Sequence, residues 1–172
     1  MPPEDRRAEP SPDTVELVAA RLKERIYAGL TVMAVLAGHA LSHAPSHRAT
    51  ALTVIGTSLG LWLATVAAEQ QAHRVVHGSS SRSEVLRQFY VTSPLLTAAI
   101  APLVLITLSA LGAFPLEGAL WAAVGIDAAS LFGFGVLSGL RMRARWSFAL
   151  VSGLVNLGIG AFVVAVKVWA GH

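Results

Sequence analysis

Five long apolar stretches, separated by short polar segments, dominate the chain. Their approximate limits are 26–44, 49–69, 93–113, 117–140 and 146–169. A helix needs about 20 apolar residues to cross a bilayer, and each stretch is close to that length or longer. The first stretch is the weakest, because His39, Ser42 and His43 dilute its outer half. The pattern predicts an all-α, polytopic membrane protein with five transmembrane helices.

The segments around these stretches divide the chain further. Residues 1–13 are rich in proline and charge, which predicts a disordered cytoplasmic tail. The five-helix transmembrane domain then occupies residues 26–172. Within it, residues 70–92 form the longest polar segment, which is expected to be a cytoplasmic linker.

Residues 14–25 have the pattern of a short amphipathic helix. One face carries Val15, Val18 and Leu22, and Arg21 and Glu24 lie opposite. An amphipathic helix next to an apolar run is typical of a juxtamembrane segment that lies at the membrane surface.

The composition agrees with a membrane protein, because only 13% of residues are charged and 54% are hydrophobic. There is no cysteine, which excludes thiolate metal sites and disulfides.

The distribution of the charged residues predicts the orientation of the chain in the membrane. Of the 13 Lys and Arg residues, the segments on one side hold all except Arg48 and Lys167. The positive-inside rule then predicts a cytoplasmic N-terminus and an outer C-terminus, in a bacterial inner membrane or an organelle membrane. The basic loops face anionic lipid, so nucleic acid is not expected as a partner.

Small residues recur at four-residue spacing in the last two stretches, where they let helices approach closely. The first series is Gly125, Ala129 and Gly133, and Gly135 and Gly139 form a second pair. In the fifth stretch, Ser152, Asn156 and Gly160 share one stripe. These stripes predict packing within one chain, or a homodimer interface.

Asp127 is the residue whose charge has the highest free-energy cost in a membrane. It lies near the middle of the fourth stretch, where a charge costs about 2.5–3.5 kcal/mol on insertion scales. Asn156 lies at a comparable depth in the next stretch, and Ser130 is one turn from Asp127. We expect these three side chains to form either an ion or proton path, or an interhelical polar clamp.

Five of the six histidines fall into two series. His39, His43 and His47 follow one another at four-residue spacing at the outer end of the first stretch. Glu69, His73 and His77 do the same at the inner end of the second. Side chains four residues apart share a helix face, and two imidazoles so placed can chelate a divalent ion such as Zn, Fe or Mn. The alternative is that these histidines are tolerated at headgroup depth.

Three segments resemble the vacuolar iron transporter family of membrane metal exporters. They are ATVAAEQQAHR (64–74), SPLLTAAIAPLVLITLSAL (93–111) and SLFGFGVLSGLRMRARW (130–146). The resemblance implies a five-span, dimeric, proton-coupled antiporter of divalent metal ions. Among the family's functional residues, only Glu69 carries over. The first span here contains no carboxylate, and segment 70–92 contains only Glu84.

Two functions follow from these features. The first is a small transporter or channel, most plausibly for a divalent metal ion (Fe, Mn or Zn) with proton coupling. The second is a non-transporting scaffold or regulatory subunit that binds partner membrane proteins. An enzyme is not expected, because no spacing brings together a nucleophile with a base.

Overall fold

The computed structural model is all-α and describes residues 12–41, 46–78, 82–141 and 145–170, without the side chains of residues 12–14, 76–77 and 170. The predicted tail 1–13 thus lies almost wholly outside the described residues. The helices of the described part are α1 (Pro12–Ala40), α2 (His47–His77), α3 (Arg82–Thr97), α4 (Ile100–Ala110), α5 (Leu116–Arg141) and α6 (Trp146–Ala170).

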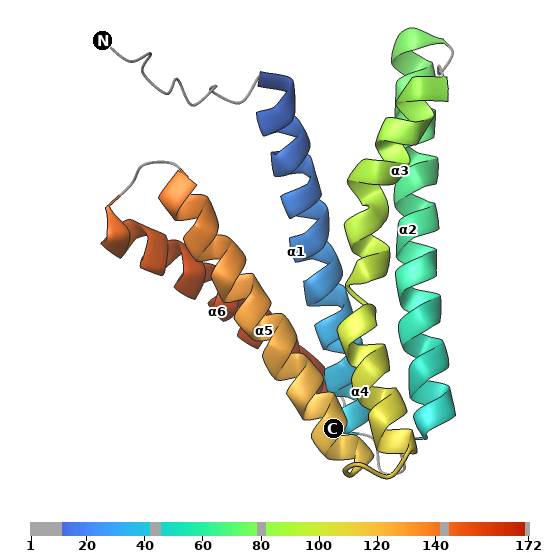
Figure 1. Ribbon diagram of the computed structural model, residues 1–172, viewed down its shortest axis with the longest axis vertical. Coiled ribbons are helices and arrows are strands. Elements are labelled where there is room, and N and C mark those ends of the chain that lie inside the picture. The colour runs from blue at the N-terminus through green and yellow to red at the C-terminus, as the bar shows by residue number, and fades with distance from the viewer. Residues whose placement is uncertain (1–11, 42–45, 79–81, 142–144, 171–172) are drawn as a thin grey trace, which may run out of the picture.

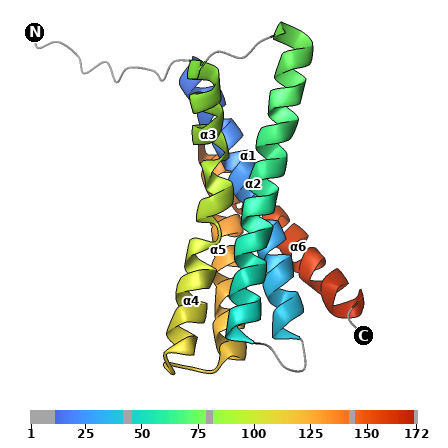
Figure 2. The ribbon, with the colours of Figure 1, turned by 90° about the vertical axis from the view of Figure 1, so that its right-hand side faces the viewer.

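The helices form an antiparallel bundle with α1 near its centre. Figure 1 shows α2 beside the α3–α4 pair on one side of α1, and the α5–α6 pair on the other. The start of α1, the end of α2 and the start of α3 lie at one end of the bundle, as do the end of α5 and the start of α6 (Figure 1), and Figure 2 shows the ends of α1, α2 and α3 from the side. Most of the described cations, including Arg21, Arg74, Arg82 and Arg141, lie toward this end, which we call the basic end.

Four segments of the described chain are long and apolar enough to cross a membrane. They are His47–Val75, Arg82–Ala110 (α3 with α4), Leu116–Arg141 and Trp146–Trp169. These segments overlap four of the five predicted spans, as expected for a membrane protein. The remaining predicted span, the first one at 26–44, falls mainly in α1, and the described part of α1 is not long and apolar enough to be counted with the other four. Its apolar part runs only from Ile26 to Ala40, short of the about 20 residues that a span needs.

Helix α1 also differs from the prediction in its first half. It runs unbroken from Pro12 to Ala40, so residues 14–25 are not a separate helix. Glu24 was predicted to lie opposite the apolar face, but it is 4% exposed, whereas Val15 is 55% exposed. The buried face follows four-residue spacing from Glu24 through Ala28, Val32, Leu36 and Ala40. The packing of the whole helix, rather than the local pattern of its first turns, therefore decides which face is buried.

Two prolines shape the third predicted span. Proline lacks an N–H and its ring clashes with the carbonyl four residues earlier. The helix is accordingly interrupted at Ala98–Ala99, four residues before Pro102. Pro94 leaves the Tyr90 carbonyl without its helical donor.

That carbonyl is satisfied by other groups. The Ser93 hydroxyl donates to it at 2.9 Å, and Arg21 Nη1 of α1 donates to it at 2.7 Å. The Arg21 guanidinium also lies 3.9 Å from the centroid of the Tyr90 ring. A neighbouring helix thus compensates the proline, as is common in membrane helices.

The predicted linker 70–92 is mostly helical. α2 continues to His77 and α3 begins at Arg82, with Gly78 ending α2 in a positive-φ conformation (φ 76°). α2 and α3 therefore form a helical hairpin that extends beyond the rest of the bundle at the basic end (Figure 1).

Glycines allow α5 and α6 to touch backbone to backbone. A Cβ at Gly139 would lie 2.5 Å from Ala149 Cα, and one at Gly135 would lie 2.6 Å from the Ser152 carbonyl oxygen. A Cβ at Gly160 would lie 2.8 Å from Met33 Cε of α1. Gly125 and Gly133, in contrast, have no atom within 4 Å of such a Cβ. The second glycine pair therefore makes the helix contact within the chain, and the first series does not.

Candidate functional site

Asp127 lies near the middle of α5, on the face that packs into the bundle. It is 4% exposed, and its Oδ2 has no hydrogen-bond partner among the described residues. Arg25 of α1 is close enough to interact with it electrostatically. A buried carboxylate oxygen without a partner is costly, so its presence calls for an explanation.

The expected cluster of Asp127, Asn156 and Ser130 does not form. Asn156 Nδ2 donates to the Leu131 carbonyl oxygen at 3.5 Å, one turn from Asp127. The Ser130 hydroxyl donates to the carbonyl of Ile126 on its own helix, at 2.8 Å. Of the two predicted arrangements, the polar clamp between Asp127 and Asn156 is therefore not formed.

The register of the α5–α6 hairpin explains this difference. Gly139 lies against Ala149, and Gly135 against Ser152 and Gly153. Continued along the two helices, this register brings Asp127 opposite the turn of α6 that contains Gly160. Asn156 is therefore about one turn too close to the hairpin connection to reach the carboxylate.

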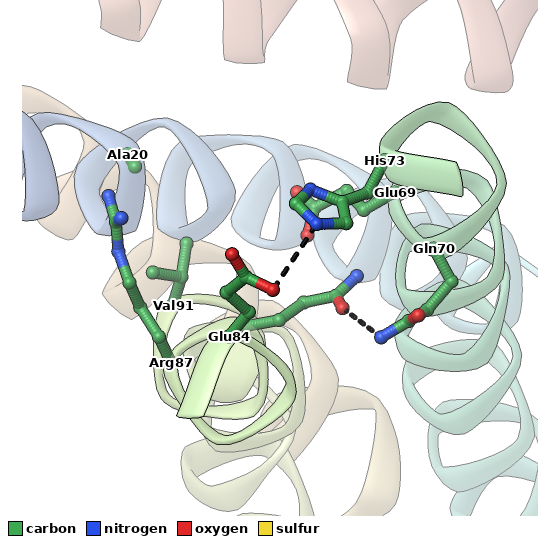
Figure 3. A pocket seen from close by; sticks show the side chains of 8 residues that line it. Ala20, Glu69, Gln70, His73, Glu84, Arg87 and Val91 are labelled. Atoms are coloured by element: carbon green, nitrogen blue, oxygen red, sulfur yellow. Dashed lines mark hydrogen bonds and ion pairs between the residues drawn. The ribbon is translucent and has the colours of Figure 1, made fainter. Parts of the chain in front are cut away.

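A second polar site, which we call the inner pocket, lies at the basic end between α1, α2 and α3. It has a volume of about 500 Å³ and is lined by Ala20, Glu69, Gln70, His73, Glu84, Arg87, Gln88 and Val91. Glu69 and His73 lie one turn apart on α2 and both line this pocket, as their spacing predicts. His73 Nε2 is 3.3 Å from Glu84 Oε2 of α3, and Figure 3 shows this pair facing across the pocket.

Two glutamines hold the walls of the inner pocket together. Gln70 Nε2 donates to Gln88 Oε1 at 2.7 Å, and Gln88 Nε2 donates to the Val66 carbonyl oxygen at 3.0 Å. Arg87 is the cation of the pocket, and in Figure 3 it points toward Ala20, away from His73. The lining therefore combines two carboxylates and one imidazole on one side with a single guanidinium on the other.

Glu69, His73 and His77 were predicted to be metal ligands, and of these Glu69 and His73 line the inner pocket. Among the described residues, no three His, Asp or Glu side chains form a group that could hold a metal ion. The side chain of His77 is outside the described part. Glu69, His73 and Glu84 share a pocket wide enough for water, so water would have to complete any coordination shell there.

The outer histidines do not share one helix face. α1 ends at Ala40 and α2 begins at His47, so the four-residue spacing is interrupted, and His43 falls outside the described residues. His39 Nδ1 lies 3.3 Å from Thr50 Oγ1. His47 Nε2 lies 2.9 Å from Ser109 Oγ, whose proton goes to the Phe114 carbonyl oxygen. His39 thus contacts α2, whereas His47 contacts α4.

Glu24 and Glu84 lie at or near the inner pocket but are not among the site residues predicted from the sequence. Glu24 lies one turn further into the bundle than Ala20, on the face of α1 that borders the inner pocket, and its Oε1 is 3.1 Å from Lys23 Nζ. Its burial could have been found from the four-residue repeat that it begins. Glu84 and Gln88 are spaced by one turn, which marks a polar face of α3 that must meet another helix.

The geometry defines an all-α chain with four helices able to span a membrane, a buried carboxylate and a polar pocket at the basic end. The chain matches no protein-family model, no curated protein and no solved structure.

Proposed function

We propose that the chain is a small membrane transporter that moves a cation, with Asp127 as the cation-binding or proton-carrying group in the middle of the membrane. The observation that supports this is the unpartnered, buried carboxylate oxygen on an apolar helix. Intramembrane carboxylates typically face a path for ions or protons, because the bilayer penalises them elsewhere. A structural clamp would use this oxygen in a hydrogen bond.

The proposed topology has five passes, with α1 as the first. α1 packs against α2, α3, α5 and α6, so protein rather than lipid surrounds much of its surface. The cations at the basic end support a cytoplasmic location for that end under the positive-inside rule. The N-terminus is then cytoplasmic and the C-terminus lies on the opposite side.

In this orientation the inner pocket opens toward the cytoplasm. His73 and Glu84, 3.3 Å apart, offer a nitrogen and an oxygen ligand of the kind that suits divalent Fe, Mn or Zn, with water to complete the shell, and the volume of about 500 Å³ admits a hydrated ion. Glu24, buried one turn deeper, supplies a further carboxylate toward the interior. The resemblance to vacuolar iron transporters adds the expectation of proton coupling and a homodimer.

The test of this function is ion flux into proteoliposomes that contain the purified protein, read with internal dyes for Mn²⁺ and for pH. We expect Asp127→Asn to reduce flux to the rate of empty vesicles, because the amide cannot carry a proton or balance a cation. Glu117→Gln is the matched control, since Glu117 is exposed on the same helix. Unchanged flux in Asp127→Asn would contradict the role of Asp127.

The inner pocket has its own prediction. His73→Ala should weaken Mn²⁺ or Zn²⁺ binding by about tenfold or more, because removing a ligand costs at least as much as removing a supporting partner. Titration calorimetry measures this affinity. His47→Ala is the control, because His47 lies at the opposite end of α2 and bonds to Ser109. Equal weakening by both variants would rule out the inner pocket as the capture site.

A non-transporting scaffold is the second candidate. The observation that favours it is the small buried share of two spans, 11% for His47–Val75 and 17% for Trp146–Trp169, which leaves wide faces for partner helices. The outward series Gly125, Ala129 and Gly133 is similarly open to a second copy. Absence of both Mn²⁺ and proton flux in the unaltered protein would favour this function.

A further inference from the structure

A second cavity, which we call the basic cleft, has no role in either proposed function. It lies between α1, the α3–α4 junction and the basic end of α5, with a volume of about 660 Å³. Figure 1 shows α3 and α5 diverging on either side of α1 toward this end. Its walls combine three arginines with apolar side chains, chiefly Arg21, Arg25, Arg141, Ile100, Phe134 and Leu137.

The arginines make one part of the cleft strongly cationic. Arg21 and Arg25 are one turn apart on α1, and Arg141 is the last residue of α5. No Asp or Glu is among the described residues that line the cleft. Asp127, which interacts electrostatically with Arg25, lies outside the lining, so the cleft itself presents a positive patch of three guanidinium groups. Guanidinium matches phosphate oxygens in a bidentate manner, so the patch suits a phosphate.

Hydrogen bonds from α1 to α3 fix two of these arginines. Arg21 Nη1 donates to the Tyr90 carbonyl oxygen at 2.7 Å, and Arg25 Nη1 donates to Thr97 Oγ1 at 3.1 Å. Each guanidinium has five N–H donors, so one such bond leaves others for a ligand. The cationic groups are thus positioned in advance rather than free to turn into solvent.

The apolar part of the cleft continues from the arginines into the bundle. Along α5 the lining runs from Arg141 inward to Leu137 and Phe134, and Ile100 faces it from the first turn of α4. Leu137 and Ile100 are both exposed. A cationic rim beside an apolar slot on a membrane helix bundle fits an amphiphile that has a phosphate head and an acyl chain.

We propose that the basic cleft binds one anionic phospholipid from the leaflet at the basic end of the bundle. Its phosphate is held by Arg21, Arg25 and Arg141, and one acyl chain lies along Ile100, Phe134 and Leu137. Basic pockets between membrane helices are known to suit anionic headgroups, and the charge complementarity selects such a lipid over a zwitterionic one.

The experiment is native mass spectrometry of the full chain in detergent, with added dioleoyl phosphatidylglycerol or dioleoyl phosphatidylcholine. We expect one bound phosphatidylglycerol and much weaker binding of phosphatidylcholine. Arg25→Gln and Arg141→Gln should each weaken phosphatidylglycerol binding by about fivefold. The control is Arg74→Gln with Arg82→Gln, which removes two exposed cations of the same end outside the cleft. Equal weakening by the control pair would overturn the proposal in favour of general surface attraction.

A steric variant tests the acyl chain separately from the charge. Leu137→Trp fills the slot while leaving all three arginines, so it should reduce phosphatidylglycerol binding at least as much as Arg141→Gln. Arg21 is left intact because it also satisfies the Tyr90 carbonyl, and circular dichroism verifies that each variant is folded. Binding unchanged by Leu137→Trp, or abolished by millimolar inorganic phosphate, would show a headgroup or free-phosphate site and overturn the proposal.

Discussion

Replacing Gly139 by alanine is expected to cost stability near the top of the about 1–3 kcal/mol typical of overpacked sites. The new Cβ would meet Ala149 Cα at 2.5 Å, and this neighbour is backbone that cannot turn away as a side chain can. The two helices must therefore separate, and their other close contact at Gly135 is lost with them. Unfolding in sodium dodecyl sulfate, followed by circular dichroism, measures the effect.

Gly133→Ala is the matched control for this prediction. It lies on the same helix, but nothing comes within 4 Å of its added Cβ. Since alanine has the higher helix propensity, the control is expected to be neutral or to gain up to about 1 kcal/mol. Equal destabilisation by Gly133→Ala and Gly139→Ala would mean that α5 and α6 do not pack through the second glycine pair.

Leu131→Ala should be the most damaging truncation at the junction of α1, α5 and α6. Leu131 is 1% exposed, its Cδ1 lies 3.2 Å from the Cβ position of Gly160, and its Cδ2 lies 3.8 Å from that of Gly29. Removing it leaves a cavity between three helices, and such truncations cost about 2–5 kcal/mol. The same detergent titration would show a lower midpoint.

Leu154→Ala is the comparison for Leu131→Ala. Leu154 is 58% exposed on α6, so its truncation removes contacts with the surroundings rather than with the core. Both changes replace leucine by alanine inside a helix, so their intrinsic helix propensities cancel. A loss at Leu154 as large as that at Leu131 would place the core of the bundle elsewhere.

The four segments able to span a membrane were predictable from the sequence, because apolar length is a property of each segment alone. The contacts between helices were harder to predict from the sequence. The series Gly125–Gly133 and the pair Gly135–Gly139 have the same spacing, and only the direction in which α5 faces α6 distinguishes them. The inner pocket was predictable only in part. The four-residue spacing of Glu69 and His73 predicts that they share a face of α2, whereas the position of Glu84 depends on how α3 packs against α2.

For Asp127, too, burial could be predicted from its own segment, but its neighbours could not be predicted from that segment alone. Its burial follows from the cost of a carboxylate in an apolar segment. Its neighbours depend on the hairpin register, which the contacts of Gly135 and Gly139 determine. Counting back from the middle of the segment RMRAR brings Ile159, not Asn156, opposite Asp127, and the contacts of Gly135 and Gly139 agree with that count within about one residue on each helix.

The position of α1 has a consequence for how the protein is made. α1 packs against α2, α3, α5 and α6, yet it is the least apolar of the proposed passes. α1 leaves the ribosome before α5 and α6, which cover much of its surface. In the proposed five-pass arrangement, α1 therefore lacks the hydrophobicity to enter the bilayer alone. We expect it to wait at the interface until the later helices have been synthesised, so that its insertion completes assembly rather than starting it.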